Sequence, residues 1–165
     1  MGKAEFLQLT MPHQGIIYKV VNIYADNKED KDDLLQEIWL QLWLSYPRFK
    51  AASRISTWMY QVALNTALTY TRKSATRNRH LRTIAAEPVI EEDKQVRHEQ
   101  ERILWEMIRS LPKAEKALIL LYIEGISYRE IAEITGESES NVGVKLNRIK
   151  QKMKHNLNTT TKTPQ

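Results

Sequence analysis

Residues 140–150 carry amide and cationic side chains and no acidic residue. Arginine and lysine can donate hydrogen bonds to guanine edges or to phosphates, and asparagine can pair with adenine through two hydrogen bonds. These residue types therefore indicate a helix that reads duplex DNA in the major groove. The candidate DNA-contacting residues are Ser140, Asn141, Lys145, Asn147, Arg148 and Lys150.

The residues just before this stretch predict how it is presented. Ser127 and Glu130 match a capping box, in which the serine oxygen accepts from an early helix N–H and the glutamate binds back to the serine N–H. A helix should therefore begin there, and Gly136 would permit a sharp turn after it. A second apolar stripe follows at Val142, Leu146, Ile149 and Met153. This is the spacing of a helix-turn-helix, and a helical hairpin with a basic exposed face is the alternative.

A second acid-free stretch, residues 51–79, combines aromatic and cationic side chains. Single-stranded nucleic acid stacks its bases on aromatic rings, at about 1–3 kcal/mol per base, while cations follow the phosphates. Trp58 and Tyr60 would point about 200° apart on a helix, so we expect one of them to face solvent or a ligand. The candidates for contact with a single strand, including the loop before this stretch, are Phe49, Arg54, Trp58, Tyr60, Arg72 and Lys73.

Residues 32–43 hold more large apolar side chains than one buried helix face requires. At about 100° per residue, one arc that suffices for a core face holds Leu34, Leu35, Ile38 and Leu42. Trp39 and Trp43 lie outside that arc. The second face also holds Asp33, Gln36 and Leu40. Tryptophan among polar side chains is typical of a protein–protein hot spot, and the alternative is that neighbouring helices cover both faces.

The elements that position these residues are predicted from apolar spacing, which is helical throughout and gives no convincing alternating strand. Helical stripes occur near residues 16–24, 34–42, 55–72, 103–111 and 113–124. Residues 79–97 instead contain a proline and an acidic cluster with little periodicity. We expect an all-α fold of two small helical domains, residues 1–78 and 98–157, joined by a flexible linker at 79–97 and followed by a disordered tail at 158–165.

Composition narrows the function classes. The chain has 165 residues, 42% of them apolar, which suffices for packed cores, and its net charge of +5 permits a polyanionic partner. The absence of cysteine excludes a disulfide scaffold, cysteine-ligated zinc and a thiol nucleophile. No apolar run approaches the roughly 18–20 residues of a membrane span, so we expect no membrane insertion and a cytoplasmic location. No nucleophile–base pair, phosphate-binding glycine loop or metal-ligand spacing is visible, so we expect no enzyme activity, cofactor or metal.

In order and spacing, the three stretches together resemble a bacterial RNA polymerase sigma factor of the extracytoplasmic-function (ECF) group. The stretch DKDDLLQEIWLQLW is similar to that family's region 2.2, and RFKAASRISTWMYQVALNTALTYTRK is similar to its regions 2.3 and 2.4. The stretch LPKAEKALILLYIEGISYREIAEITGESESNVGVKLNRIKQKMK is similar to region 4. The resemblance spans residues 14–156 and implies a sigma region 2 domain followed by a sigma region 4 domain.

The resemblance implies an alternative transcription initiation factor that binds core RNA polymerase, through the β′ clamp helices and the β subunit, and directs it to specific promoters. The residues that would contact polymerase are Asp33, Gln36, Glu37, Trp39, Leu40 and Trp43. Asn65 would line the pocket for a base flipped out of the minus-ten element, with Phe49 in the adjoining loop. The C-terminal domain would read the minus-thirty-five element as a duplex, and an anti-sigma factor would cover these surfaces.

Gly143 and Val144 stand where relatives commonly carry a basic residue and a serine. Glycine also weakens a helix interior by about 1 kcal/mol relative to alanine. We therefore expect sequence-dependent DNA shape to contribute more to specificity at these positions.

Two other interpretations remain open. An autonomous helix-turn-helix regulator with an N-terminal dimerisation or sensing domain would explain residues 127–154. It would leave residues 48–79 and the second face of residues 32–43 without a purpose. An inert helical interaction module would treat the basic clusters as solvated surface and would bind DNA weakly and without selectivity.

Overall fold

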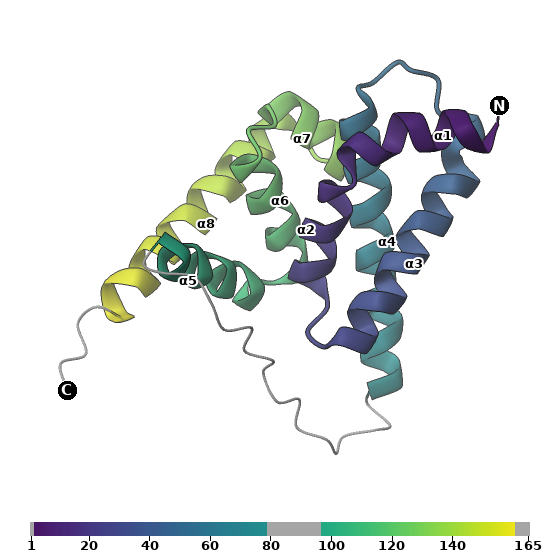
Figure 1. The fold of residues 1–165 in the computed structure, drawn as a ribbon. Coiled ribbons are helices and arrows are strands. Elements are labelled where there is room, and N and C mark those ends of the chain that lie inside the picture. The colour runs from purple at the N-terminus through teal and green to yellow at the C-terminus, as the bar shows by residue number, and fades with distance from the viewer. Residues whose placement is uncertain (1, 79–96, 161–165) are drawn as a thin grey trace. The chain divides into compact units, whose positions relative to one another are not determined.

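The structure is a computed structural model that describes residues 2–78 and 97–160 (Figure 1). Every regular element in these ranges is a helix, which confirms the all-α prediction. The N-terminal range contains α1 (Lys3–Thr10), η1 (Met11–His13), α2 (Gly15–Tyr24), α3 (Lys28–Ser45), η2 (Tyr46–Arg48) and α4 (Ile55–Asn78). The C-terminal range contains α5 (Arg97–Ser110), α6 (Lys113–Ile123), α7 (Tyr128–Thr135) and α8 (Glu139–Thr160).

Contacts divide the chain into two compact units, Met1–Gln95 and Val96–Gln165. The linker expected at 79–97 lies outside the described residues except for its last residue, which begins α5. The helix α8 extends to Thr160, three residues into the segment 158–165 that we expected to be disordered, and residues 161–165 lie outside the described range. The domain boundaries expected at 78 and 98 therefore stay predictions.

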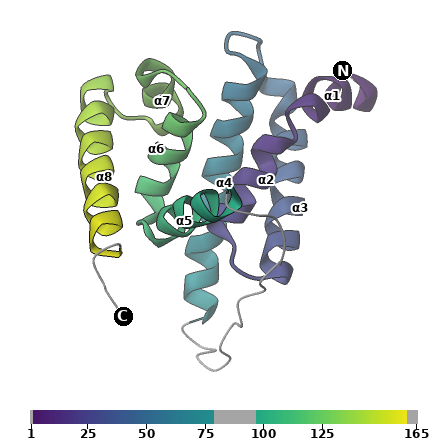
Figure 2. The same cartoon turned by 60° about the vertical axis from the view of Figure 1, so that its left-hand side comes forward.

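The N-terminal unit is built on α2, α3 and α4, each of which packs against the other two (Figures 1 and 2). Its fully buried side chains come from all three helices: Ile17, Ile23, Leu34, Ile38, Leu42 and Met59. Asn27 caps the start of α3, because its side-chain oxygen accepts a 2.8 Å hydrogen bond from the N–H of Asp30. This cap fixes the first turn of the helix that carries both tryptophans of the second face.

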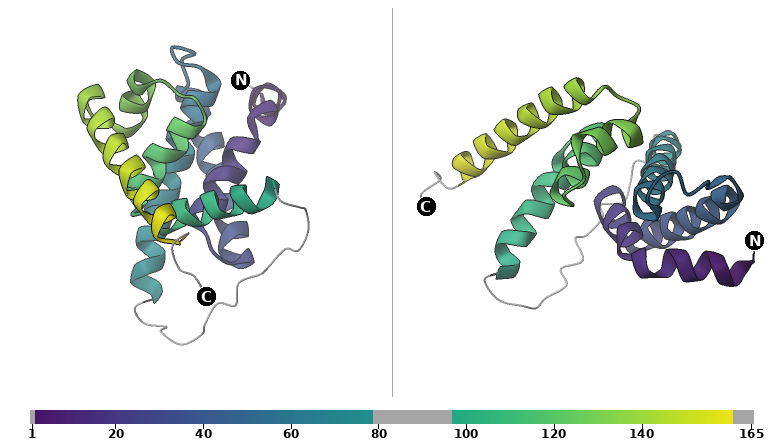
Figure 3. Two further views of the ribbon diagram at one scale, coloured as in Figure 1. Left: turned by 90° about the vertical axis from the view of Figure 1, so that its left-hand side faces the viewer. Right: turned by 90° about the horizontal axis from the view of Figure 1, so that it is seen from above.

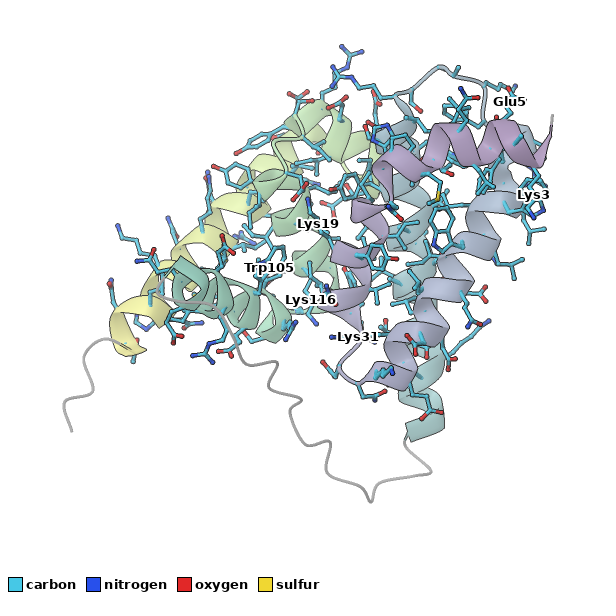
Figure 4. All side chains as sticks on the ribbon, viewed as in Figure 1. Lys3, Glu5, Lys19, Lys31, Trp105 and Lys116 are labelled. Atoms are coloured by element: carbon cyan, nitrogen blue, oxygen red, sulfur yellow. The ribbon has the colours of Figure 1, made fainter. Side chains whose placement is uncertain are left out.

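A short N-terminal helix, α1, was not predicted from the sequence. Lys3 and Glu5, both labelled in Figure 4, lie on it. Phe6 is its one buried apolar side chain, and the buried Thr10 hydroxyl donates a 2.8 Å hydrogen bond to the carbonyl of Phe6. Because a single buried side chain gives no periodic stripe, apolar spacing did not indicate this helix.

The C-terminal unit packs α7 against both α6 and α8, and α5 against α6 (Figure 3). The Oγ of Ser127 accepts a 3.2 Å hydrogen bond from the N–H of Glu130, so the predicted start of α7 is confirmed. Gly136 ends that helix with φ of +72°, in the left-handed region that glycine adopts without strain. The result is the helix-turn-helix that the sequence predicts, with Val142, Leu146 and Ile149 of α8 buried.

Candidate functional site

The helix α3 has the two faces that its sequence predicts. Leu34, Ile38 and Leu42 are completely buried, as the expected core arc requires. Leu35, at the edge of that arc, is only half-buried. Leu40 and Trp43 remain 48% and 42% exposed. Around them, Asp33 and Gln36 are exposed, whereas Glu37 and Trp39 are half-buried. The exposed part of this face combines a large aromatic surface with carboxylate and amide groups, a combination suited to binding another protein.

The helix α1 covers part of this face, so the alternative of coverage by a neighbouring helix holds in part. The ring of Phe6 meets the rings of Trp39 and Trp43 edge-on, with centroids 6.3 Å and 5.2 Å apart. It also lies 5.2 Å from the ring of Tyr46. Burial raises the pKa of the Tyr46 hydroxyl, and the charge of Glu5 and a hydrogen bond to its carboxylate raise it further. Contacts from α1 thus set the orientation of both tryptophans.

A groove of about 390 Å³ runs between α3 and α4. It is lined by Glu37, Gln41, Asn65, Thr66, Thr69, Tyr70 and Lys73. The amide of Gln41 donates a 2.9 Å hydrogen bond to the carboxylate of Glu37, which fixes one wall. The Tyr70 hydroxyl donates a 3.3 Å hydrogen bond to the carboxylate of Asp30, which fixes the outer end of the tyrosine side chain. The groove therefore offers carboxylate, amide, hydroxyl and ammonium groups to one ligand.

This groove joins residues that the sequence assigned to different partners. Glu37 was expected to contact polymerase, whereas Asn65 and Lys73 were expected to contact DNA. The residues Gln41, Thr66 and Thr69 were not singled out, and helical spacing within α4 alone could have placed Thr69 one turn beyond Asn65. Arg72, also expected to contact DNA, is exposed but does not line the groove.

The expectation that Trp58 or Tyr60 faces solvent or a ligand is wrong. Trp58 is 9% and Tyr60 3% exposed. Both can be buried because α4 packs against α2 and α3 together, while η2 and the residue after it cover a further side. The ring of Trp58 lies 6.4 Å from that of Tyr46 and 5.0 Å from that of Phe49. The buried ring of Trp58 thus packs against the half-buried ring of Phe49 and holds it in place.

The loop before α4 presents the remaining residues of this group. Phe49 is half-buried on Trp58, and Arg54 is exposed immediately before α4. Between them, Ala51 has φ of +53°, a left-handed conformation that costs a residue with a Cβ roughly 1–2 kcal/mol. Such strain persists where the surrounding structure fixes it, and it is often found at binding loops.

The helix α8 exposes a polar face around Ser140, Asn141, Asn147 and Arg148. Ser138, which the sequence reading did not single out, begins this helix by accepting a 3.1 Å hydrogen bond from the N–H of Asn141. A serine that precedes an apolar stripe is a recognisable helix start signal, because serine is a preferred N-cap residue. This exposed face is the part of the helix-turn-helix that could enter a DNA groove.

Two of the predicted cations on α8 are engaged within the unit. Lys145 Nζ lies 2.7 Å from a carboxylate oxygen of Glu137, at the turn before the helix. Lys150 Nζ lies 4.6 Å from the centre of the Tyr122 ring on α6, and its side chain is half-buried. Lys150 therefore stands apart from the polar face, whereas Lys145 borders it.

Within the described ranges, no group of three or more His, Asp or Glu side chains has a geometry that could hold a metal ion. Among the helices described, none is both long and apolar enough to cross a membrane.

Comparison with known proteins connects both units to one family. The family model for Sigma-70 region 2 matches residues 9–77, and the model for Sigma-70, region 4 matches residues 101–153. The chain is 29% identical over 149 residues to the ECF RNA polymerase sigma-E factor of Haemophilus influenzae, covering 80% of this chain and 76% of that protein. It is 27% identical over 158 residues to the RNA polymerase sigma factor SigV of Bacillus subtilis, covering 94% and 92%.

Two solved structures share the fold. One is CnrH in complex with the cytosolic domain of CnrY, with a TM-score of 0.68, 18% identity and coverage of 96% of this chain and 90% of that chain. The other is the sigma factor RpoE in complex with the anti-sigma factor NepR from Bartonella quintana, with a TM-score of 0.69, 15% identity and coverage of 93% and 97%. The relatives do not favour an autonomous helix-turn-helix regulator. The two family matches and the sigma factors of similar sequence together show that the chain belongs to the sigma-70 family, as an ECF-group RNA polymerase sigma factor that initiates transcription at specific promoters.

Proposed function

We propose that three surfaces divide the work of this sigma factor. The exposed face of α3 binds the β′ clamp helices of core RNA polymerase. The groove between α3 and α4, with the Phe49 loop, holds the non-template strand of the minus-ten element. The polar face of α8 reads the minus-thirty-five element. The observation that carries the proposal is the exposure of Leu40 and Trp43 on a helix whose core arc is already complete.

The polymerase surface rests on this surplus of exposed apolar area. Trp43 and Leu40 contribute nothing to the buried arc of α3, yet they form a continuous face with the exposed groups of Asp33 and Gln36. Trp39 is held beside them by Phe6. Desolvating a positioned tryptophan inside a ring of polar contacts is the usual source of hot-spot affinity.

The minus-ten surface rests on the chemistry of the α3–α4 groove. The exposed amide of Asn65 can pair with a base edge, and Lys73 can neutralise a phosphate. Phe49 offers a half-buried ring supported by Trp58 for stacking. Trp58 and Tyr60, both buried, take a supporting role in this proposal and are not direct contacts. Arg54, Arg72 and Lys73 would follow the backbone.

The minus-thirty-five surface rests on Asn141, Asn147 and Arg148, which are exposed on one helix that carries no acid beyond its first residue. Lys145 would have to leave Glu137 before contacting a phosphate, so its contribution should be smaller than that of Arg148.

The same surfaces make an anti-sigma factor a natural partner. The RpoE structure that shares this fold holds the anti-sigma factor NepR. A protein that covered the exposed face of α3 would block polymerase directly. We further propose that the chain catalyses no reaction itself and acts in the cytoplasm, where its polymerase and promoters are.

The test is the affinity of the full chain for core RNA polymerase. Trp43→Ala should weaken binding by about 2 kcal/mol or more, the size of a hot-spot loss, while native helicity is kept. Tyr18→Ala is the matched control, because Tyr18 is a similarly exposed aromatic on α2, at 48%, outside the α3 face. Unchanged affinity of a folded Trp43→Ala variant would overturn the assignment of α3, as would an equal loss from Tyr18→Ala.

A further inference from the structure

Val144 occupies the middle of the exposed face of α8. Its side chain is 49% exposed. At about 100° per residue, it lies roughly opposite the mean direction of the buried Val142, Leu146 and Ile149. Ser140 and Arg148, one turn before and one turn after it, are also exposed. An apolar side chain therefore stands at the centre of an otherwise polar face.

Packing does not account for this valine. A β-branched residue is a weaker helix former than alanine, and a half-exposed side chain adds little to the core. A single exposed apolar residue has no meaning by itself on an ordinary surface. Here its neighbours are side chains that can contact base edges, so its surroundings and not its exposure alone suggest a role.

The neighbouring position behaves differently. A Cβ built on Gly143 would lie 3.6 Å from Cε2 of Tyr128, so this position faces α7 and not the exposed side. Lys145 is paired with Glu137, and Lys150 lies over the Tyr122 ring. The centre of the exposed face is thus formed by Val144 with its polar neighbours.

We propose that Val144 specifies a thymine in the minus-thirty-five element through the C5-methyl group of that base. The thymine methyl is the apolar group that a base pair presents in the major groove, and small aliphatic side chains contact it. Desolvation of both methyl surfaces favours thymine over bases that present only polar atoms there. At Val144 this direct contact replaces the contribution of DNA shape that the sequence led us to expect. The inference rests on the proposed function, because it requires α8 to lie in the major groove.

The test uses the full chain assembled with core RNA polymerase. A promoter selected by this complex from a library randomised in the minus-thirty-five region is remade with each thymine of that region replaced, one at a time, by deoxyuridine, which lacks only the methyl group. One replacement should weaken binding about fourfold, the equivalent of burying one methyl group. The Val144→Ala variant should bind the thymine promoter more weakly and lose its sensitivity to that replacement.

Leu157→Ala is the matched control, an exposed aliphatic in the last turns of the same helix, at 44%. It should keep the full sensitivity to deoxyuridine. The inference is overturned if no replacement changes binding by more than twofold, or if Val144→Ala keeps the wild-type sensitivity. In those cases the proposed function stands if the complex still selects a minus-thirty-five sequence. A complex that forms but selects none would overturn both.

Discussion

The substitution Gly143→Ala should stabilise α8. Gly143 lies inside the helix, where glycine is about 1 kcal/mol less favourable than alanine. The added Cβ would lie 3.6 Å and 3.8 Å from two carbons of the Tyr128 ring, which is ordinary van der Waals contact. Because no neighbour has to move, we expect almost the full difference in helix propensity between glycine and alanine to appear in the stability of the unit.

The expected magnitude is a stabilisation of about 1 kcal/mol, equal to about a fivefold decrease in the equilibrium constant for opening. Hydrogen exchange of the full chain measures this directly, as slower exchange of those α8 amides that open with the helix. For a domain of this size the same change raises the unfolding temperature by roughly 4–8 °C.

Gly136→Ala is the matched control, because it makes the same chemical change in a different backbone conformation. Nothing lies within 4 Å of the Cβ that would be added, but φ is +72°. We expect this variant to be destabilised by roughly 1–2 kcal/mol, the cost of a left-handed residue with a Cβ. The reasoning is refuted if both variants shift stability in the same direction, or if Gly143→Ala speeds exchange in α8.

Three further outcomes are expected. Arg148→Ala should lower the slope of log affinity against log salt for minus-thirty-five duplex by about 1, because one cation that neutralises a phosphate is lost. An unaltered slope removes Arg148 from the phosphate contacts. Phe6→Ala should expose α1 to proteolysis and shift the tryptophan fluorescence, because Phe6 is the buried anchor of that helix. Leu7→Ala, which alters an exposed residue, should do neither. Equal protease resistance of the two variants would refute the anchoring role of Phe6. Glu5→Gln should lower the pKa of Tyr46 in an ultraviolet titration, since it removes the charge that helps to raise that pKa above 10.0. Because the pKa of Tyr46 is raised in the folded state, this hydroxyl contributes stability below about pH 10 that is lost as the pH rises through the folded pKa. A pKa of Tyr46 that is unchanged by the substitution would contradict the contact with Glu5.

Local signals predicted much of the fold correctly. The core arc of α3 and the capped start of α7 depend on residues three or four apart, which periodicity and capping chemistry describe well. The left-handed turn at Gly136 has the same local origin. Each of these features is determined by residues within one or two helical turns of one another.

Features that depend on contacts between elements were missed. The helix α1 is held by the contact of Phe6 with rings more than thirty residues later in the chain, and its own sequence has no apolar stripe. Trp58 and Tyr60 are both buried because neighbouring helices cover more than one side of α4. The apolar periodicity of one helix does not tell how many of its sides are covered. The pairing of Lys150 with Tyr122 likewise crosses two helices.

The central claim is that this chain directs core RNA polymerase to particular promoters, and the most direct measurement is transcription by the purified chain and core polymerase on DNA from its own genome. We predict transcripts with discrete start sites at a defined promoter, absent without the chain. The contradicting result is the failure to form a stable polymerase complex, combined with tight and sequence-selective binding of duplex DNA by the chain alone.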